Sequence, residues 1–586
     1  MGPVIQENKE GQQNQARPWV KLRQGTVVGI TLYQPDENET HGSEKPVPVQ
    51  AFLGIPYALP PTGDRRFRPP VKIGDSSDLS IDASRYGPAA PGKPLLRAGP
   101  KLEYSEDCLT VNVFRQQQVP QPQPHSQGGE DLGSGLLPVA IYVHGGAFNR
   151  GSASMHDTAS LVAWSEQPFV AVSFNYRVGA LGFLPSSLSA KEGALNLGLK
   201  DQKLLFEWVQ ENIGSFGGDK NNVTLFGLSA GAHSIGHHMM RHNDQNPGPF
   251  HRVIMESGAP TSRAVRAFDS ELHERQFHEF LTEVGCPSDL PSAQVFPFLR
   301  SLSLSVITKA QETVFDRYNP SLRWAFQPVI DGEMILRKPI DSWRSGNYYK
   351  VPIMTGFCGN EGSLYVDKQM STDEQFVDFF RTLLPQLSDA DIDTVAHTLY
   401  PDPETSKDLT YKETRQSTEI GPQYKRVEAA YGHYAYVAPA RQTAELASKT
   451  ESHPPTFLYH WALPSTVIGG ATHGDNMRYE TYSAGVRSLS QNQKEISGML
   501  HAYVTSFICN HGNPNAITGR WANRPKWEPY QAEEQSKSKP KTMIFGKGIE
   551  ELIGGPNTGK LVELVYDDWA VEQSRFWWDR VEVTQQ

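Results

Sequence analysis

The chain has 586 residues, of which 38% are hydrophobic and 20% are charged, so it can build a large core and is not a disordered protein. Its formal net charge is −10 and no run of Lys and Arg forms a basic face, which excludes a nucleic-acid-binding protein. No apolar run approaches the ~20 residues of a membrane span, so we expect no transmembrane segment.

The first residues of the chain are polar. Met1–Gln24 is rich in Gln, Asn and Lys and lacks the apolar stretch of a secretory signal, so we interpret it as a tail. The chain has four cysteines without the spacing of metal ligands: Cys108, Cys286, Cys358 and Cys509. A reduced state is the simpler interpretation of such cysteines. Together, the tail and the cysteines predict a cytoplasmic protein.

Residues 25–580 are predicted to form a single domain with two polar insertions. Residues 116–135 are rich in Gln, Pro and Gly, and residues 531–541 are rich in Glu, Lys and Ser. The first insertion separates two apolar runs, Leu109–Phe114 and Pro138–His144. We therefore expect these runs to be strands joined by a long hairpin connection.

Apolar patterning along the first half of the chain predicts an α/β fold. We expect antiparallel edge strands at Val27–Leu32 and Gln50–Leu53, and then an alternation of strand, helix, strand and helix at Phe169–Asn175, Leu199–Ile213, Val223–Phe226 and Ala230–Arg241. Such alternation is typical of a large, mostly parallel sheet with helices on both faces. Ligand sites in these sheets lie beyond the carboxyl ends of the strands.

A candidate nucleophile lies in Gly227–Gly231, which matches Gly-x-Ser-x-Gly with Ser229 at its centre. The motif follows a predicted strand and precedes a predicted helix, the context in which a serine sits exposed on a sharp turn. The backbone N–H of Ala230 then opens the helix and can face a developing oxyanion. The alternative is a Gly- and Ser-rich turn without chemistry, which the strand–turn–helix context disfavours.

His144–Phe148 reads His-Gly-Gly-Ala-Phe and follows the predicted strand upstream of Ser229. Esterases place an oxyanion-binding segment of the HGGG type here, because glycines let backbone N–H groups approach a carbonyl oxygen. Gly146 and Ala147 are the candidate donors, with Ala147 in place of the third glycine. A simple Gly-rich turn is the alternative.

A serine needs a histidine as base and a carboxylate to orient that histidine, and in this fold they follow the serine in the order acid, then histidine. Glu361 follows the apolar run Val351–Thr355, and His473 lies on a glycine-flanked loop. We predict Glu361 as acid and His473 as base. The alternatives are Asp331, which reads as part of a turn, and His460, which lies in an aromatic run.

Several blocks of the sequence resemble the type-B carboxylesterase/lipase family, which includes cholinesterases and fungal lipases. The blocks, within about Gly25 to Trp578, are Phe52–Pro70, Ser105–Phe114, Asn175–Leu184, Asn196–Gln202 and Phe216–Ser234. The resemblance implies an α/β-hydrolase fold, a Ser229–His473–Glu361 triad and oxyanion donors at Gly146, Ala147 and Ala230. It also implies a serine near the acid at Ser257 and an Arg66–Glu106 ion pair.

Two departures from the family are informative. Secreted relatives close a disulfide to the position of Cys108, but residues 71–107 contain no cysteine. Cholinesterases have Glu before the nucleophile, where this chain has Leu228, and a Trp in the 71–107 loop, which this chain lacks. A choline ester is therefore not expected as the substrate.

Two further patterns predict no site. Gly554–Lys560 mimics a phosphate-binding loop, but Leu561 occupies the Ser/Thr position that binds magnesium. His233 and His237 have the spacing of metal ligands on a helix, but no HExxH motif contains them. We therefore expect neither a cofactor nor a metal.

The function predicted is hydrolysis of small-molecule carboxylic esters by a serine hydrolase through an acyl-enzyme. Two alternatives stay open at this point. The same triad can transfer an acyl group to an alcohol or form and open lactones, and the same fold can serve as a non-catalytic interaction protein.

Overall fold

The computed structural model describes residues 17–34, 45–96, 99–117, 135–262, 265–517, 519–536 and 538–584. The insertion predicted at residues 116–135 lies almost wholly outside the described residues. The second, at 531–541, contains the short helix α17 (Glu533–Ser536) and ends where a strand begins at Lys541. The single-domain organisation stays a prediction.

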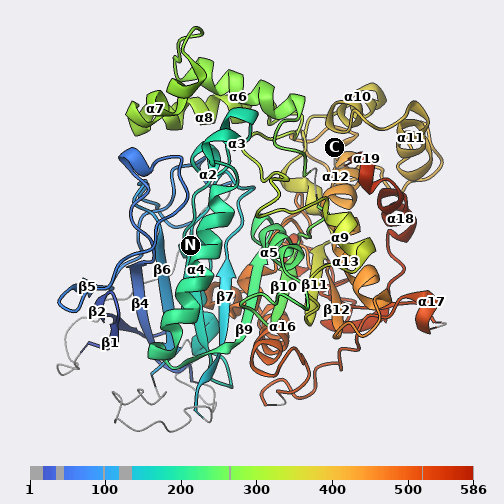
Figure 1. Cartoon of the computed structure of the whole chain (residues 1–586). Helices are drawn as coiled ribbons and strands as arrows, with labels where there is room; N and C mark the ends of the chain where they lie inside the picture. The colour runs from blue at the N-terminus through green and yellow to red at the C-terminus, as the bar shows by residue number, and fades with distance from the viewer. Residues whose placement is uncertain are drawn as a thin grey trace.

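Within the described residues, eleven strands form one sheet in the order β14-β13-β12-β11-β10-β9-β7-β8-β6-β4-β3 (Figure 1). Their bounds are β3 Ile30–Leu32, β4 Val49–Pro56, β6 Thr110–Gln116, β7 Leu137–Val143, β8 Val170–Phe174, β9 Gly218–Leu228, β10 Arg252–Glu256, β11 Ile353–Cys358, β12 Thr456–Trp461, β13 Lys541–Phe545 and β14 Val562–Tyr566. The neighbours from β8 to β13 run parallel, and antiparallel pairs lie only toward the two edges. The mainly parallel sheet is thus confirmed.

The hairpin predicted between β6 and β7 is wrong. Strand β8 lies between them, pairing antiparallel with β6 and parallel with β7. The run Phe169–Asn175 supplies this strand, and all five of its residues, Val170–Phe174, are buried. Neighbours in sequence are often neighbours in a sheet, but here a later, fully buried strand lies between them.

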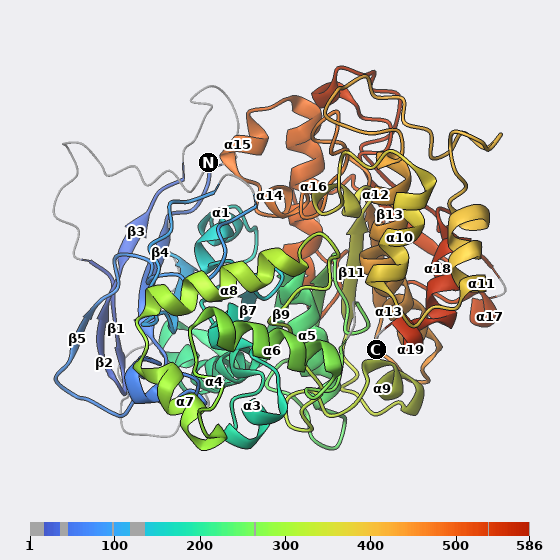
Figure 2. The same ribbon diagram turned by 90° about the horizontal axis from the view of Figure 1, so that it is seen from above.

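Side chains of the central strands alternate between two cores, because successive residues of a strand point to opposite faces. In β7, Val139, Ile141 and Val143 pack into one core, whereas Ala140 and Tyr142 pack into the other. Figure 2 shows the sheet between α4 and α5 on one side and α16 on the other. Both faces are covered, so the central strands read as continuous apolar runs.

Helices contribute residues to both cores, among them α1 Thr158–Ala163, α4 Leu197–Asn212, α5 Ala230–Arg241, α12 Tyr424–Gly432, α13 Ala438–Lys449 and α16 Gln491–Cys509. The remaining helices are α2 Gly179–Gly182, α3 Ser187–Glu192, α6 Glu271–Glu283, α7 Ser292–Ser301, α8 Leu304–Tyr318, α9 Pro339–Ser345, α10 Asp373–Leu383, α11 Asp389–Asp393, α14 Met477–Glu480, α15 Ala484–Arg487, α18 Val571–Asp579 and α19 Val581–Thr584. Figure 1 shows α6, α7 and α8 grouped at the top of the molecule, beside α2 and α3.

The first strand of the chain begins earlier than predicted. Strand β1 (Trp19–Leu22) lies inside the expected tail of residues 1–24 and pairs with β2 (Gly25–Val28), which pairs with β5 (Ser80–Asp82). Alternate residues of β1, Val20 and Leu22, are buried, so this short segment gains apolar contacts despite its polar surroundings. Among the described residues, no helix has both the length and the apolar character needed to cross a membrane.

Five parallel neighbours, β7, β9, β10, β11 and β12, bring their carboxyl ends to one edge of the sheet. The register places Val143 beside Gly227, and Glu256 beside both Leu228 and Gly356. The loops that follow these strands therefore meet at that edge. They include every loop in which the sequence predicts a site residue.

Candidate active site

Ser229 lies on a sharp turn between β9 and α5. Its backbone has φ 59° and ψ −124°, a strained conformation for a residue other than glycine. The Ser229 N–H donates to the carbonyl oxygen of Glu256 at 2.9 Å, which ties the turn to β10. A Cβ on Gly227 would lie 2.6 Å from the Val143 carbonyl oxygen, so this position requires glycine. The turn therefore holds Ser229, which is 6% exposed, at the carboxyl end of β9 on a rigid support, as a Gly-x-Ser-x-Gly turn does.

Glu361 and His473, predicted as acid and base, are joined by a hydrogen bond. His473 Nδ1 lies 2.5 Å from Glu361 Oε2, and both side chains are at least nine-tenths buried. The other carboxylate oxygen, Oε1, accepts the Cys358 N–H at 2.7 Å. The rings of Tyr365 and Tyr436 lie against the imidazole, with centroids 5.3 and 4.5 Å away. The carboxylate is thereby fixed on the side of the imidazole that carries Nδ1.

The histidine loop packs against the residue that precedes Ser229. A Cβ built on Gly474 would lie 2.9 Å from the Leu228 side chain, so the backbone next to His473 is in close contact with β9. Asn360 holds the acid and histidine loops together, because its N–H donates to the Ala471 carbonyl oxygen at 2.9 Å and its Oδ1 accepts the Ala471 N–H at 3.0 Å. The Ser229 turn, the Glu361 loop and the His473 loop thus lie against one another.

The segment predicted as the oxyanion loop has an unusual backbone. Gly146, Ala147 and Phe148 all have positive φ, at 119°, 54° and 61°. The Ala147 carbonyl oxygen accepts hydrogen bonds from Asn149 Nδ2 at 2.9 Å and from Gln327 Nε2 at 3.0 Å, which holds this conformation. Within the described part of the chain, the N–H groups of Gly146 and Ala147 donate to no protein acceptor. They are therefore available to a ligand.

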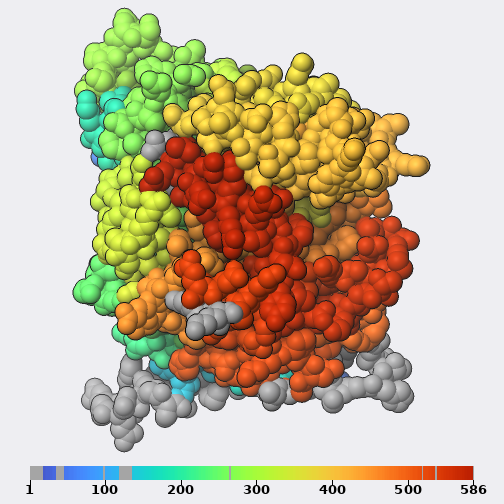
Figure 3. Space-filling view, turned by 90° about the vertical axis from the view of Figure 1, so that its right-hand side faces the viewer, coloured from blue at the N-terminus to red at the C-terminus, as the bar shows by residue number. Residues whose placement is uncertain are grey.

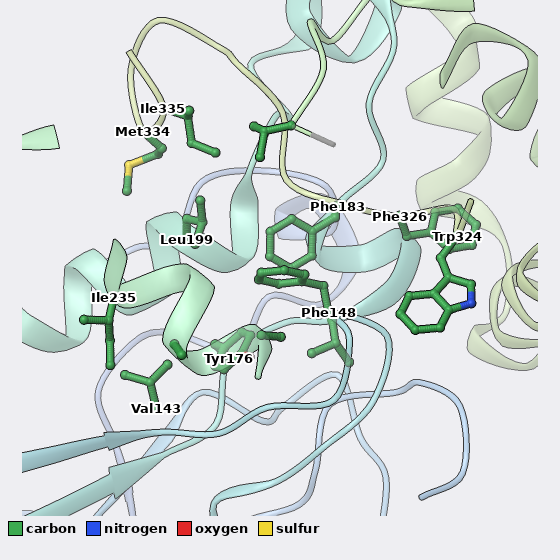
Figure 4. Close-up of a cluster of buried hydrophobic side chains, with 14 of the residues drawn as sticks. Val143, Phe148, Tyr176, Phe183, Leu199, Ile235, Trp324, Phe326, Met334 and Ile335 are labelled. Atoms are coloured by element: carbon green, nitrogen blue, oxygen red, sulfur yellow. The ribbon is translucent and has the colours of Figure 1, made fainter. Parts of the chain in front are cut away.

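Packing anchors this loop in the core. Figure 4 shows Phe148 against Phe183, in a cluster that includes Tyr176 and Leu199, and the two phenyl centroids lie 5.1 Å apart. The Tyr176 hydroxyl donates to the His144 carbonyl oxygen at 2.7 Å, and the two rings stack. The packing of large buried side chains thus holds the N–H groups of Gly146 and Ala147 in place.

Gly145→Ala is expected to lower kcat for ester hydrolysis by about 100-fold, because an added Cβ displaces the loop from its place beside the serine. That Cβ would lie 2.6 Å from the Leu228 carbonyl oxygen and 3.0 Å from the Ser229 Cβ. The matched control is Gly485→Ala, since nothing lies within 4 Å of a Cβ at Gly485. Equal kinetics for the two variants would contradict the assigned position of the loop.

Ser257, expected near the acid, reaches it through a cysteine. Its hydroxyl lies 3.9 Å from Cys358 Sγ, and the Cys358 N–H is the group that donates to Glu361. Ser257 also has a positive φ of 47°, at the end of β10. The Arg66–Glu106 pair is buried and bidentate at 2.6 and 2.7 Å, and Arg66 also donates to the Leu302 carbonyl oxygen.

The two alternative residues lie elsewhere. Asp331 accepts the N–H groups of Glu333, Met334 and Ile335, so it stabilises a turn, as its sequence context indicated. His460 stacks on Trp569 with centroids 4.5 Å apart. The histidines of α5 are packed rather than solvated: His233 lies 3.0 Å from the Ala259 carbonyl oxygen. In the described residues, no group of three or more His, Cys, Asp or Glu side chains could hold a metal ion.

Sequence reasoning missed a buried ionisable cluster beneath the serine. Glu256 and Glu480 carry neighbouring buried carboxyl groups, and His156 Nε2 lies 3.1 Å from Glu480 Oε1. Burial raises the pKa of Glu256 well above its ordinary value and that of Glu480 to about 8, and it lowers the pKa of His156 to about 4. At neutral pH the pair therefore retains a proton and the imidazole is neutral. No spacing in the sequence links these three residues, which are at least 100 positions apart.

The raised pKa of Glu480 predicts that stability falls as pH rises. The folded state holds a proton that the unfolded state loses near pH 4.5, so the stabilisation is complete below about pH 4.5 and is lost as pH approaches about 8. We expect Glu480→Gln to show a smaller loss of Tm than the wild type between pH 6 and pH 9. Glu534→Gln, at an exposed position, is the control. Parallel Tm curves for all three proteins would contradict this assignment.

The chain is 35% identical to "Secreted lipase 4" of Gibberella zeae, over 87% of this chain and 86% of that protein. It is 28% identical to "Secreted triacylglycerol lipase LIP1" of the same organism, over 90% and 87%. A crystal structure of Aspergillus niger EstA superimposes with a TM-score of 0.75 at 24% identity, covering 97% of this chain and 99% of that one. The chain therefore has the α/β-hydrolase fold.

The predicted cytoplasmic location is wrong, because both of these relatives are named as secreted. All four cysteines lie in the described residues and are free. Disulfides are common in small secreted domains, but a large core makes them dispensable, so free cysteines do not identify the compartment. The model of the "Carboxylesterase family" matches residues 16–543. The chain thus belongs to the carboxylesterase family, a family of ester hydrolases.

Proposed function

We propose that this protein hydrolyses carboxylic esters with Ser229 as nucleophile, His473 as base and Glu361 as the orienting acid. The observation that carries the proposal is the 2.5 Å hydrogen bond between His473 Nδ1 and Glu361 Oε2, on loops packed against the Ser229 turn. With Nδ1 engaged by the carboxylate, Nε2 is the nitrogen that accepts the serine proton.

The reaction follows from these positions in two steps. His473 takes the Ser229 proton as the hydroxyl oxygen attacks the ester carbonyl, and the N–H groups of Gly146, Ala147 and Ala230 bind the oxyanion. Protonated His473 then gives its proton to the leaving alcohol, while Glu361 stabilises the imidazolium. Water repeats the sequence on the acyl-enzyme and releases the acid. The names of the relatives support secretion of this chain as a further part of the proposal.

Product analysis tests the proposal. The purified protein is incubated with 4-nitrophenyl butyrate, and butyric acid is measured with and without added butanol. Hydrolysis predicts one acid released per nitrophenol in water and only minor formation of butyl butyrate with the alcohol. Butyl butyrate as the main product would instead identify an acyl transferase. No nitrophenol release by a folded protein would favour a non-catalytic scaffold.

A further inference from the structure

A π-helical turn interrupts the helical segment that runs from α12 to α13. The turn, η7 (His433–Val437), directly follows α12 and directly precedes α13. Pro439 accounts for its position, since proline has no N–H for the Ala435 carbonyl oxygen and its ring would clash with that carbonyl in a regular α-helix. π turns inside α-helices are rare and occur frequently at functional sites. This turn is therefore a candidate for a functional role.

The residue before the π turn contacts the proposed acid. A Cβ on Gly432 would lie 2.8 Å from the Gly362 nitrogen and 3.2 Å from the Glu361 Cβ. A Cβ on Gly362 would in turn clash with the carbonyl oxygen of Glu428, one helical turn earlier. The helix backbone and the Glu361 loop are therefore in direct contact, with no space for a side chain between them.

Tyr436, inside the π turn, contacts the proposed base. Its side chain is fully buried, and its ring centroid lies 4.5 Å from that of the His473 imidazole. Tyr365, four residues after the proposed acid, stacks on Tyr436 with centroids 5.8 Å apart. His233, four residues after the proposed nucleophile, also stacks on Tyr436, at 6.4 Å. One ring thus lies within aromatic contact distance of the segments that carry all three proposed catalytic residues.

The π turn explains how Tyr436 reaches this place. Glu428, Gly432 and Tyr436 are spaced by four residues. On a regular α-helix with ~3.6 residues per turn, two such steps would carry Tyr436 about 80° around the axis from Glu428. The i→i+5 hydrogen bonds of a π turn place more residues in each turn, so the ring stays nearer to the side that faces the Glu361 loop.

The C-terminal segment packs against other residues of the π turn. His433 meets the Trp569 ring edge-on at 5.0 Å, and Tyr434 lies against Trp577 of α18 at 5.2 Å. Figure 3 shows the dark red C-terminal segment at the surface, next to the gold and orange segments. The π turn is thus held between this segment and the loops that carry the proposed acid and base. Such packing fixes the rotamer of a buried ring, which is how supporting residues orient a catalytic group.

We propose that the π turn is a positioning element of the active site, in which the Tyr436 ring supports the His473 imidazole and Gly432 supports the Glu361 backbone. These contacts hold the imidazole in the orientation in which Glu361 engages Nδ1, and this leaves Nε2 for the serine proton. The effect of the turn on the rate rests on the proposed function, whereas its effect on the orientation of the imidazole does not.

Tyr436→Leu is expected to lower kcat for 4-nitrophenyl butyrate by about 100-fold and to keep KM within about threefold, because a displaced base slows the reaction without weakening ester binding. Tyr436→Phe keeps the ring and is expected to retain kcat within about threefold. The matched control is Tyr434→Leu, which removes another buried tyrosine ring from the same turn, where it lies against Trp577. We expect this control to have the kcat of the wild type.

Gly432→Ala tests the contact with the acid and removes no side chain from the core. The added Cβ is expected to displace the Glu361 backbone and to lower kcat about tenfold at unchanged KM. Gly485→Ala is the matched control, since nothing lies within 4 Å of a Cβ at Gly485. If Tyr436→Leu does not fold, as judged by circular dichroism, the difference between these two glycine variants decides the proposal.

Proton NMR of the full-length protein tests the orientation of the imidazole without turnover. The His473 Nδ1 proton, hydrogen-bonded to Glu361, is expected to give a resonance downfield of the amide protons, which His473→Gln assigns by its loss. The resonance is expected to persist in Tyr436→Phe and Tyr434→Leu and to be lost in Tyr436→Leu. A wild type that shows the resonance but hydrolyses no ester would contradict the proposed function alone, and the resonance would then decide the positioning role.

Three results would overturn the positioning role. The first is a folded Tyr436→Leu whose kcat and downfield resonance equal those of Tyr434→Leu. The second is a raised KM at unchanged kcat in Tyr436→Leu, which would place this residue in the ester-binding surface instead. The third is an equal loss of kcat in Tyr436→Phe and Tyr436→Leu, which would exclude the ring as the supporting group.

Discussion

Ser229→Ala is expected to lower kcat for ester hydrolysis by about 10⁶-fold, because loss of the nucleophile in a serine triad costs about this much. The residual rate comes from substrate binding and the oxyanion donors alone. Initial rates on 4-nitrophenyl butyrate measure the loss. The fold is expected to survive, since alanine meets the same backbone strain as serine at φ 59°.

The matched control is Ser257→Ala. Ser257 is also a buried serine at a strand end with a positive φ of 47°, but its hydroxyl makes only a weak contact to Cys358 Sγ at 3.9 Å. We expect its kcat to stay within about tenfold of the wild type. A loss in Ser257→Ala as large as that in Ser229→Ala would contradict the assignment of the nucleophile.

Glu361→Gln is expected to lower kcat by about 10⁴-fold, the loss seen when an amide replaces the acid of a serine triad. The Cys358 N–H requires an acceptor at the Oε1 position, so the Gln oxygen is expected to lie there and its NH₂ group to face His473 Nδ1. The imidazole would then carry its proton on Nε2 and could not accept the Ser229 proton. Steady-state kinetics at saturating ester measure the effect.

Asp331→Asn is the control for this charge removal. Asp331 accepts the N–H groups of three residues in a turn, and asparagine retains an oxygen for them. We expect unchanged kcat in Asp331→Asn and little change of KM in Glu361→Gln. If Glu361→Gln retained kcat within tenfold of the wild type while Asp331→Asn lost it, the acid would have been misassigned.

Local sequence patterns predicted the parts of the site that depend on the backbone. The Gly-x-Ser-x-Gly motif requires the turn seen at Ser229, because Gly227 has no room for a Cβ. Glu361 and His473 were predicted from their places after apolar strands, and the structure joins them, because parallel strands deliver their carboxyl ends to one edge. The bounds of α5 agree with the predicted helix Ala230–Arg241, since its residues have both the periodicity and the flanking turn, whereas β9 extends beyond the predicted Val223–Phe226 to Gly218–Leu228.

Features that depend on long-range pairing could not be read from the sequence. The place of β8 between β6 and β7 depends on which apolar strand packs best in the middle of the sheet, and any of the three satisfies the same local pattern. The Glu256–Glu480 pair joins residues with no spacing signal. Burial raises the pKa of both carboxyl groups, and the charge of Glu480 adds to the rise at Glu256. Cellular location depends on transport signals rather than on packing, and the polar N-terminal residues and the four cysteines led to a wrong prediction of it.

The central claim is that Ser229 is an activated nucleophile, and a fluorophosphonate probe tests it most directly. The probe is added to the wild type and to Ser229→Ala, and the adduct is located by mass spectrometry of the digested protein. We expect one adduct per wild-type chain, on the peptide that contains Ser229, and none in the variant. An adduct on another residue, equal labelling of the variant, or no labelling of a folded, ester-hydrolysing wild type would contradict the account.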